Sequence, residues 1–239
     1  LTPTHANLTG GDYTLDTASP VTFTSGGALT QVIQITPQND NIVEADETFN
    51  IEIGGPSPAT DWDTVAAAAV EGTIISEDEF TVTITPAADS ELENSGNPIE
   101  FTVEISNPVD WDVDIPFLLT PTHASLSPSD YTLDTSSPLV FATGGALTHT
   151  IQITPLDDNI VEEDETFDIT VASPNPGIGW DSTLPSAATG TIQSEDQYTL
   201  TITPAADSEV ENSGSPMEFT VTLSNPVAWD VSVSYVLTP

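Results

Sequence analysis

Short segments of this chain alternate between apolar and polar residues with the period of two that is typical of β-strands. In the segment 98–106 the apolar residues share one face and polar residues occupy the other: Ile99, Phe101, Val103 and Ile105. The same alternation recurs at 80–84, 111–119, 137–142, 147–154, 165–172 and 190–193. Pro, Gly, Asn and Ser separate these segments, and no segment has a convincing helical period. The pattern predicts an antiparallel β-sandwich.

The chain also repeats itself with a period of 118 residues. LTPTHA at 1–6 returns at 119–124, and LTP returns at 237–239. A period of this length indicates tandem domains rather than the shorter units of solenoids or propellers. We predict the C-terminal two-thirds of one repeat at 1–78, a complete repeat at 79–196 and the N-terminal third of another at 197–239. Incomplete sandwiches expose unpaired strand edges, so we expect further repeats or strands from a neighbouring copy to complete them.

The charge composition narrows the functions that this chain can have. Its 239 residues include 38 Asp and Glu but no Lys, Arg or Cys, which gives a formal net charge of −38. Nucleic-acid binding is excluded because it relies on Lys and Arg at the phosphates, and attraction to anionic membranes fails for the same reason. The longest apolar run, at 65–70, is too short for membrane insertion. Such a chain is expected to bind a cation.

Many of the acidic residues gather in predicted loops. In the complete repeat the densest segment is DDNIVEEDETF at 157–167, and SED at 194–196 follows the last strand. Calcium takes six to eight oxygen ligands, mostly carboxylates and carbonyls, and therefore suits these loops better than magnesium does. Zinc and copper would require His or Cys, which are nearly absent. The alternative interpretation is a solvated acidic face that binds no ion.

The order of these segments resembles the Calx-β domain, which is known from sodium–calcium exchangers, integrin β4 and large surface proteins. The matching segments are LENSG at 92–96, SDYTL at 129–133, FATGG at 141–145, IQITPLDDNIVEEDETF at 151–167 and GTIQSED at 190–196. Through the repeat, the resemblance extends over the whole chain. It implies an all-β fold of tandem immunoglobulin-like sandwiches, with calcium ions (Ca2+) at the end that carries the acidic loops.

The resemblance also implies a set of metal ligands in each repeat. In the complete repeat they are Glu93, Asp130, Asp157, Asp158, the carbonyl of Ile160, Glu162, Glu165, Glu195 and Asp196. In the flanking parts they are Asp12, Asp40, the carbonyl of Ile42, Glu44, Glu47, Glu77 and Asp78, and also Glu211. Ser76 and Ser194 stand where calcium-binding members carry an acid, and Asn39 replaces an Asp. These departures favour fewer or weaker ions per repeat.

These features predict an extracellular or cell-surface structural and adhesive protein, in which calcium stiffens tandem sandwiches into a rod or filament. The segments 72–84 and 190–202 run from one repeat into the next with almost no linker, which favours a stiff array. Further copies of the chain or further repeats, calcium and glycans are the expected partners. The alternative is a calcium-sensing regulatory module of a larger transporter or receptor.

We do not expect an enzyme. The chain has no G-x-S-x-G motif, and no motif places a His beside an acid. Paired carboxylates could serve a glycosidase, but a small repeated sandwich offers no substrate cleft.

Overall fold

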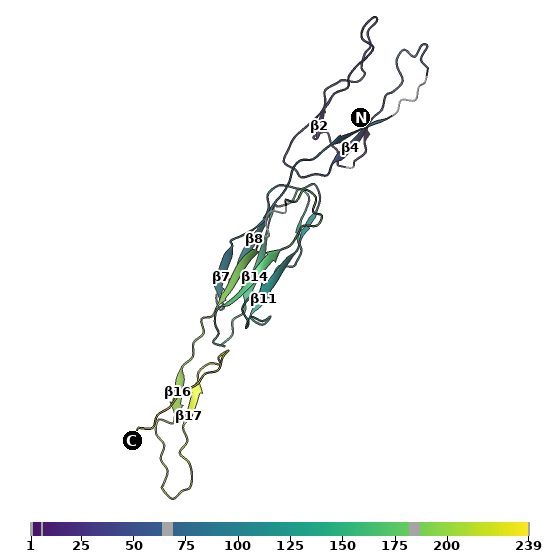
Figure 1. The fold of residues 1–239 in the computed structure, drawn as a ribbon. Coiled ribbons are helices and arrows are strands. Elements are labelled where there is room, and N and C mark those ends of the chain that lie inside the picture. Colours follow the sequence, from purple (N-terminus) through teal and green to yellow (C-terminus); the bar gives the residue numbers. More distant parts are fainter. Residues whose placement is uncertain (1, 6, 64–68, 182–186, 239) are drawn as a thin grey trace.

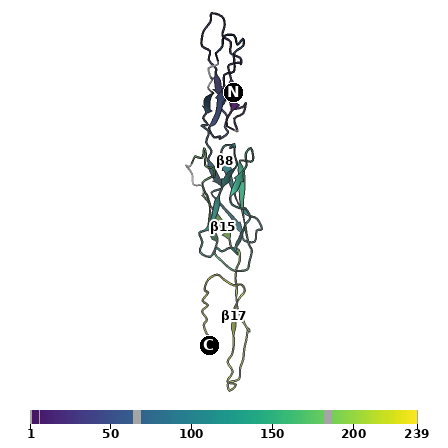
Figure 2. The ribbon, with the colours of Figure 1, turned by 90° about the vertical axis from the view of Figure 1, so that its right-hand side faces the viewer.

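The computed structural model describes residues 2–5, 7–63, 69–181 and 187–238, and these residues form β-strands and connecting loops without a helix. No helix in this described part has the length and apolar character needed to cross a membrane. The chain is elongated, with the N-terminal and C-terminal parts at opposite ends of one long axis in both views (Figures 1 and 2). The all-β tandem architecture is confirmed. The boundaries of the repeats stay a prediction; we call 1–78, 79–196 and 197–239 the N-terminal, central and C-terminal units.

The central unit is a sandwich built around two sheets. One sheet contains, in spatial order, β10 (Phe117–Pro121), β14 (Glu165–Val171), β15 (Ala187–Gln193) and β7 (Ala88–Leu92). The other contains β11 (Tyr131–Leu133), β13 (Thr148–Pro155), β8 (Ile99–Ile105) and β6 (Val82–Thr85). A further pair joins β12 (Leu139–Phe141) to β9 (Val113–Ile115). The pairs are antiparallel except β15 with β7, which is parallel.

The core of the central unit lies between these sheets. Along β8 the four apolar residues predicted to share a face are all buried, while Glu100 and Glu104 point to solvent. Phe101, Phe141 and Phe167 are fully buried in the same core. Burial of such large apolar side chains is the dominant favourable term in folding, and it requires strands from both the beginning and the end of the repeat.

The structure contains two strands of the central unit that were not predicted, β7 and β11, and it divides one predicted strand. The segment 111–119 was expected to form one strand, but it is divided into β9 and β10, which belong to different sheets. Pro116 stands between them. Proline has no N–H to donate to a strand ladder, so the chain turns from one sheet to the other there.

The flanking units contain only part of this set of strands. The N-terminal unit has the sheet β1 (Thr2–Pro3), β4 (Glu47–Ile51) and β5 (Val70–Ile74), and the pair β2 (Tyr13–Leu15) and β3 (Ile35–Pro37). The C-terminal unit has the pair β16 (Leu200–Thr203) and β17 (Thr220–Leu223). Apolar residues whose equivalents are buried in the central unit are exposed here: Phe23, Ile33, Phe219 and Val221.

Consecutive units are joined by backbone hydrogen bonds as well as by the chain itself. Val43 of the N-terminal unit donates its N–H to the carbonyl of Pro108 (2.9 Å) and accepts from the N–H of Asp110 (3.1 Å). Its side chain is fully buried and belongs to the core of the central unit. Val161, one period later, makes the same bonds with Pro226 (2.9 Å) and Ala228 (3.0 Å). Both junctions therefore use one docking geometry.

Gly179 provides the space into which Val43 fits. Its φ of +64° lies in the left-handed region, and a Cβ there would sit 2.3 Å from Cγ1 of Val43. Any residue larger than glycine would therefore have to displace the valine.

Candidate metal centre

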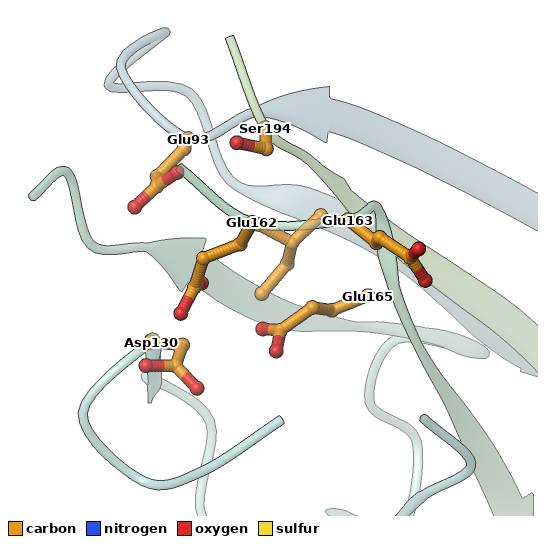
Figure 3. Close-up of a pocket in the computed structure, with 7 residues that line it drawn as sticks. Glu93, Asp130, Glu162, Glu163, Glu165 and Ser194 are labelled. Carbon is orange, nitrogen blue, oxygen red and sulfur yellow. The ribbon is translucent and has the colours of Figure 1, made fainter. Parts of the chain in front are cut away.

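Three carboxylates of the central unit meet at the end of the sandwich that faces the C-terminal unit. Oxygens of Asp130, Glu162 and Glu165 all lie within 4.8 Å of one another. Asp130 immediately precedes β11, Glu162 lies in the loop after β13 and Glu165 begins β14. Figure 3 shows the three side chains facing a common space, with Glu93 on the adjacent loop. We call Asp130, Glu162 and Glu165 the central cluster.

Local hydrogen bonds hold the loops of the central cluster in place. Asp130 accepts a bond from the N–H of Ser127 (2.6 Å). Asp158 accepts one from the N–H of Ile160 (2.5 Å) and donates its own N–H to Glu93 (3.2 Å). Aspartates bond readily to backbone N–H groups a few residues away, and this fixes turns without secondary structure. The loops are thereby shaped before any ion binds.

The central cluster includes buried oxygens without partners. Glu165 is 2% exposed, and its Oε1 has no hydrogen-bond partner in the structure. Three more buried atoms in the neighbouring segment 194–196 also lack a partner: Ser194 Oγ, Glu195 Oε2 and Asp196 Oδ2. Buried polar groups are almost always satisfied, because a bare one costs desolvation free energy without compensation. A bound cation would satisfy these oxygens.

The pKa shifts of the acidic residues around the central cluster also favour a bound cation. Burial raises the pKa of Glu93 to about 7, with repulsion from Asp158, Glu195 and Glu162 adding to it and the Asp158 N–H opposing it. Burial, followed by repulsion from Glu165 and other acids, raises the pKa of Glu162. A cation beside these carboxylates would favour their ionised form and oppose both effects.

The N-terminal unit carries an equivalent group one period earlier. Oxygens of Asp12, Glu44 and Glu47 lie within 4.8 Å of one another, and we call these residues the N-terminal cluster. Glu47 is 2% exposed and neither of its carboxylate oxygens has a hydrogen-bond partner. The Nδ1 atom of His5 is 3.8 Å from its Oε1, too far for a hydrogen bond. Burial, then repulsion from Glu47 and other acids, raises the pKa of Glu44 to about 7.

Comparison with protein families gives two consecutive matches to the Calx-beta domain, at residues 4–79 and 76–196. The chain belongs to the Calx-beta family. Among solved structures, the apo-form Calx CBD1 domain is 21% identical, with coverage of 50% of this chain and 100% of that chain and a TM-score of 0.41. The calcium binding domain CBD12 of CALX1.1 is 22% identical, with coverage of 48% and 44% and a TM-score of 0.40. Comparison with curated proteins gives no match.

Calx-beta domains are calcium-binding modules. The residues present in this chain fit a calcium ion. The N-terminal cluster and the central cluster offer only oxygen atoms, and each contains one buried glutamate with an oxygen that has no hydrogen-bond partner. The chain spans less than half the length of the CALX1.1 structure. Calcium is therefore consistent with the donor set of both clusters.

Several other predicted ligands lie around the two Calx-beta clusters. Repulsion from Asp196 and Asp157 contributes to the raised pKa of Glu195, although burial is the larger cause. In the N-terminal unit, Asp40 accepts a bond from the N–H of Ile42 (2.7 Å), as Asp158 does from Ile160. The roles of these residues as ligands stay predictions.

Three predicted ligands are not brought into either cluster in the described part of the chain. Glu77 is exposed and Asp78 is half-buried, and both follow β5 without joining the group of Asp12. Glu211 is exposed in the C-terminal unit. Its equivalent Glu93 is buried and accepts a hydrogen bond from the N–H of Asp158 (3.2 Å).

Sequence reasoning missed three contributors to the Calx-beta clusters. Glu163 lines the same hollow as the central cluster. Burial raises the pKa of Glu165, and a hydrogen bond with the hydroxyl of Ser125 opposes that rise; this hydroxyl also bonds Nδ1 of His123 (2.7 Å). Asp110, which belongs to the following unit, raises the pKa of Glu44 by repulsion. Only the alignment of Asp110 with Ala228 between repeats could have drawn attention to it.

Proposed function

We propose that this chain binds calcium through its two acidic clusters and forms part of an extracellular structural rod, with no catalytic role. One observation carries the proposal. Glu47 and Glu165, one period apart, are each buried with partnerless oxygens beside two further carboxylates. Such a repeated arrangement is costly without a cation, and the chain has no Lys or Arg to supply one.

Calcium is the cation that these donors favour. Carboxylates and nearby backbone carbonyls provide the six to eight oxygens that calcium takes, and loops tolerate its irregular geometry. The ion would supply positive charge that holds Asp130, Glu162 and Glu165 together. Extracellular modules bind calcium at about 10⁻⁴–10⁻³ M, a range in which clusters with serine in place of an acid would still be occupied outside the cell.

The proposed rod is supported by the position of each acidic cluster beside the junction with the next unit. Glu44 and Glu162 each come directly after the valine that bonds the next unit, Val43 and Val161. An ion that fixes the glutamate therefore also fixes the docking residue. The elongated shape in Figures 1 and 2 agrees with units held in line by such junctions.

Filament formation by strand addition extends the proposal. In the central unit, β8 pairs with β13 so that Phe101 faces Ile151, and Gln152 donates a side-chain bond to Glu100 (2.7 Å). The same register would place Phe219 of one copy opposite Ile33 of another. Segments that pair within one unit can pair between chains, and such head-to-tail contacts continue without closing.

Calcium titration by calorimetry and thermal unfolding tests the proposed function. Calcium at 100 times its Kd should add about 2.7 kcal/mol to the free energy of unfolding of each unit that binds it, and chelator should remove this gain. Glu162→Gln should weaken binding by the central unit, whereas Glu104→Gln, which removes an exposed charge from β8, should not. Melting curves that are identical in excess calcium and in excess chelator would contradict the proposal.

Sedimentation and negative-stain imaging of the 239-residue chain test strand addition. Head-to-tail association should lengthen the particles as concentration rises. Single particles at every concentration would rule out pairing between copies and favour completion by further repeats.

A further inference from the structure

The two junctions share their backbone bonds but differ in one side chain that faces the preceding unit. At the first junction the residue whose N–H bonds Val43 is Asp110. At the second junction the residue whose N–H bonds Val161 is Ala228, which has no carboxylate. Because the backbone is bonded in the same way, the two junctions differ at this position in the side chain.

The carboxylate of Asp110 reaches across the first junction. Its Oδ2 accepts a hydrogen bond from the side-chain amide of Asn7 in the N-terminal unit. The equivalent of Asn7 in the central unit is Ser125, which bonds His123 within its own unit instead. The first junction thus pairs Asn7 with Asp110, whereas the second has Ser125 and Ala228 at the equivalent positions.

Asp110 is half-buried and lies outside the 4.8 Å group of Asp12, Glu44 and Glu47, but it is bonded to the segment that carries that group. Val43, to which the backbone of Asp110 is bonded, is the neighbour of Glu44 in sequence. The deeply buried Glu47, with both oxygens unpartnered, is the independent sign that this cluster takes a cation.

We propose that Asp110 completes the calcium site of the N-terminal cluster from the following unit, so that the first junction closes around the ion. The inference rests on the proposed calcium binding and goes beyond it, because it assigns a ligand from a neighbouring unit to one junction and not to the other. The three carboxylates of the cluster provide at most six oxygens, the lower end of the six to eight that calcium takes, and a fourth carboxylate raises the number of available donors.

Calcium binding and docking are then coupled at the first junction. By linkage, an ion that binds more tightly to the docked units must strengthen the docking by the same factor. Without the ion, Asp110 faces like charges and opposes docking. At the second junction the docking bonds of Val161 should depend less on calcium, because Ala228 contributes neither attraction nor repulsion.

Amide hydrogen exchange of the full chain measures the stability of both junctions in the same molecule. Calcium should slow exchange of the Val43 and Asp110 amides roughly tenfold more than that of the Val161 and Ala228 amides. Asp110→Ala should abolish this excess and weaken calcium binding by the N-terminal cluster roughly tenfold, measured by calorimetry in a Glu162→Gln background. Ala228→Asp should give the second junction the calcium dependence of the first.

Glu104→Ala serves as the matched control, because it removes one exposed negative charge from a residue of β8 that makes none of the junction hydrogen bonds. If the unsubstituted chain binds no calcium, the proposed function itself fails. If it binds calcium, Glu44→Gln weakens binding and Asp110→Ala behaves like Glu104→Ala, only the role of Asp110 is overturned. Equal protection of the two junctions by calcium would overturn it as well.

Discussion

The central unit and the flanking units carry closely similar apolar residues but bury them very differently. Phe141 of the central unit is 1% exposed, whereas its N-terminal equivalent, Phe23, is 58% exposed. Phe101 is fully buried, whereas its C-terminal equivalent, Phe219, is 48% exposed. The alternating pattern of these segments is therefore not sufficient for burial. A core forms only where strands from both ends of the repeat are present, so burial depends on partners distant in sequence.

The largest expected effect comes from removing the same aromatic ring in the two environments. Phe141→Ala should lower the free energy of unfolding of the central unit by about 3–5 kcal/mol, because it leaves a cavity in a packed core. Phe23→Ala should have little effect, because the ring of Phe23 is largely exposed and its removal leaves no cavity. Chemical denaturation, followed by the fluorescence of the tryptophans, measures both.

The Phe23 variant also reports on strand addition. If a second copy completes the N-terminal unit, Phe23→Ala should become costly at concentrations where the chain associates. A small and equal effect of both substitutions would contradict the comparison between the units.

A smaller effect should follow from disturbing the junction through which the N-terminal unit contributes to the central core. Gly179→Ala places a Cβ 2.3 Å from Val43 and should destabilise docking by about 1–3 kcal/mol, as overpacking generally does. Gly144→Ala is the matched control, since Gly144 also has a positive φ (+65°) but has nothing within 4 Å of its added Cβ. Small-angle scattering should show bending only for Gly179→Ala. Equal bending in both variants would mean that backbone strain, not the contact with Val43, is responsible.

The smallest expected effect is the pH dependence of stability. It should be similar in the N-terminal and central units, because both carry buried acidic residues even though their cores differ. The pKa of Glu44 and that of Glu93 are each raised from 4.5 to about 7. Below pH 4.5 both the folded and unfolded chains hold these protons. Between pH 4.5 and 7 the unfolded chain loses them first, so stability without calcium should fall as pH rises and then level off.

Calorimetry in chelator across this pH range measures the dependence. Glu44→Gln and Glu93→Gln should each remove part of it from one unit. Saturating calcium should oppose the fall, since the ion binds the deprotonated carboxylates. A melting temperature in chelator that rises between pH 4.5 and 7 would show that the raised pKa values are wrong.

Much of the fold could be predicted from local pattern, because a half-buried strand requires alternation. The segment 98–106 was recognisable as β8 for this reason. In contrast, β7 has few apolar residues, and its parallel partner β15 lies about one hundred positions away in the chain, so no local signal marked it. The break at Pro116 was visible in principle, since proline interrupts a ladder.

The candidate site was only partly predictable. Family resemblance suggested Asp130, Glu162 and Glu165, but their convergence depends on two loops folding together, the one before β11 and the one between β13 and β14. Asp110 could not be found in this way because its role arises from contact between units, and a residue that changes from Asp to Ala between repeats gives no periodic signal.

The bonds of Val43 and Val161 also determine how the molecule responds to a mechanical load. A unit held only by its covalent connection would swivel, but each unit is held at a second point beside that connection. Tension along the molecule is therefore divided between the peptide backbone and the loop that carries the acidic cluster. A stretched molecule would transmit part of this tension to the carboxylates, so that mechanical force would change their affinity for an ion.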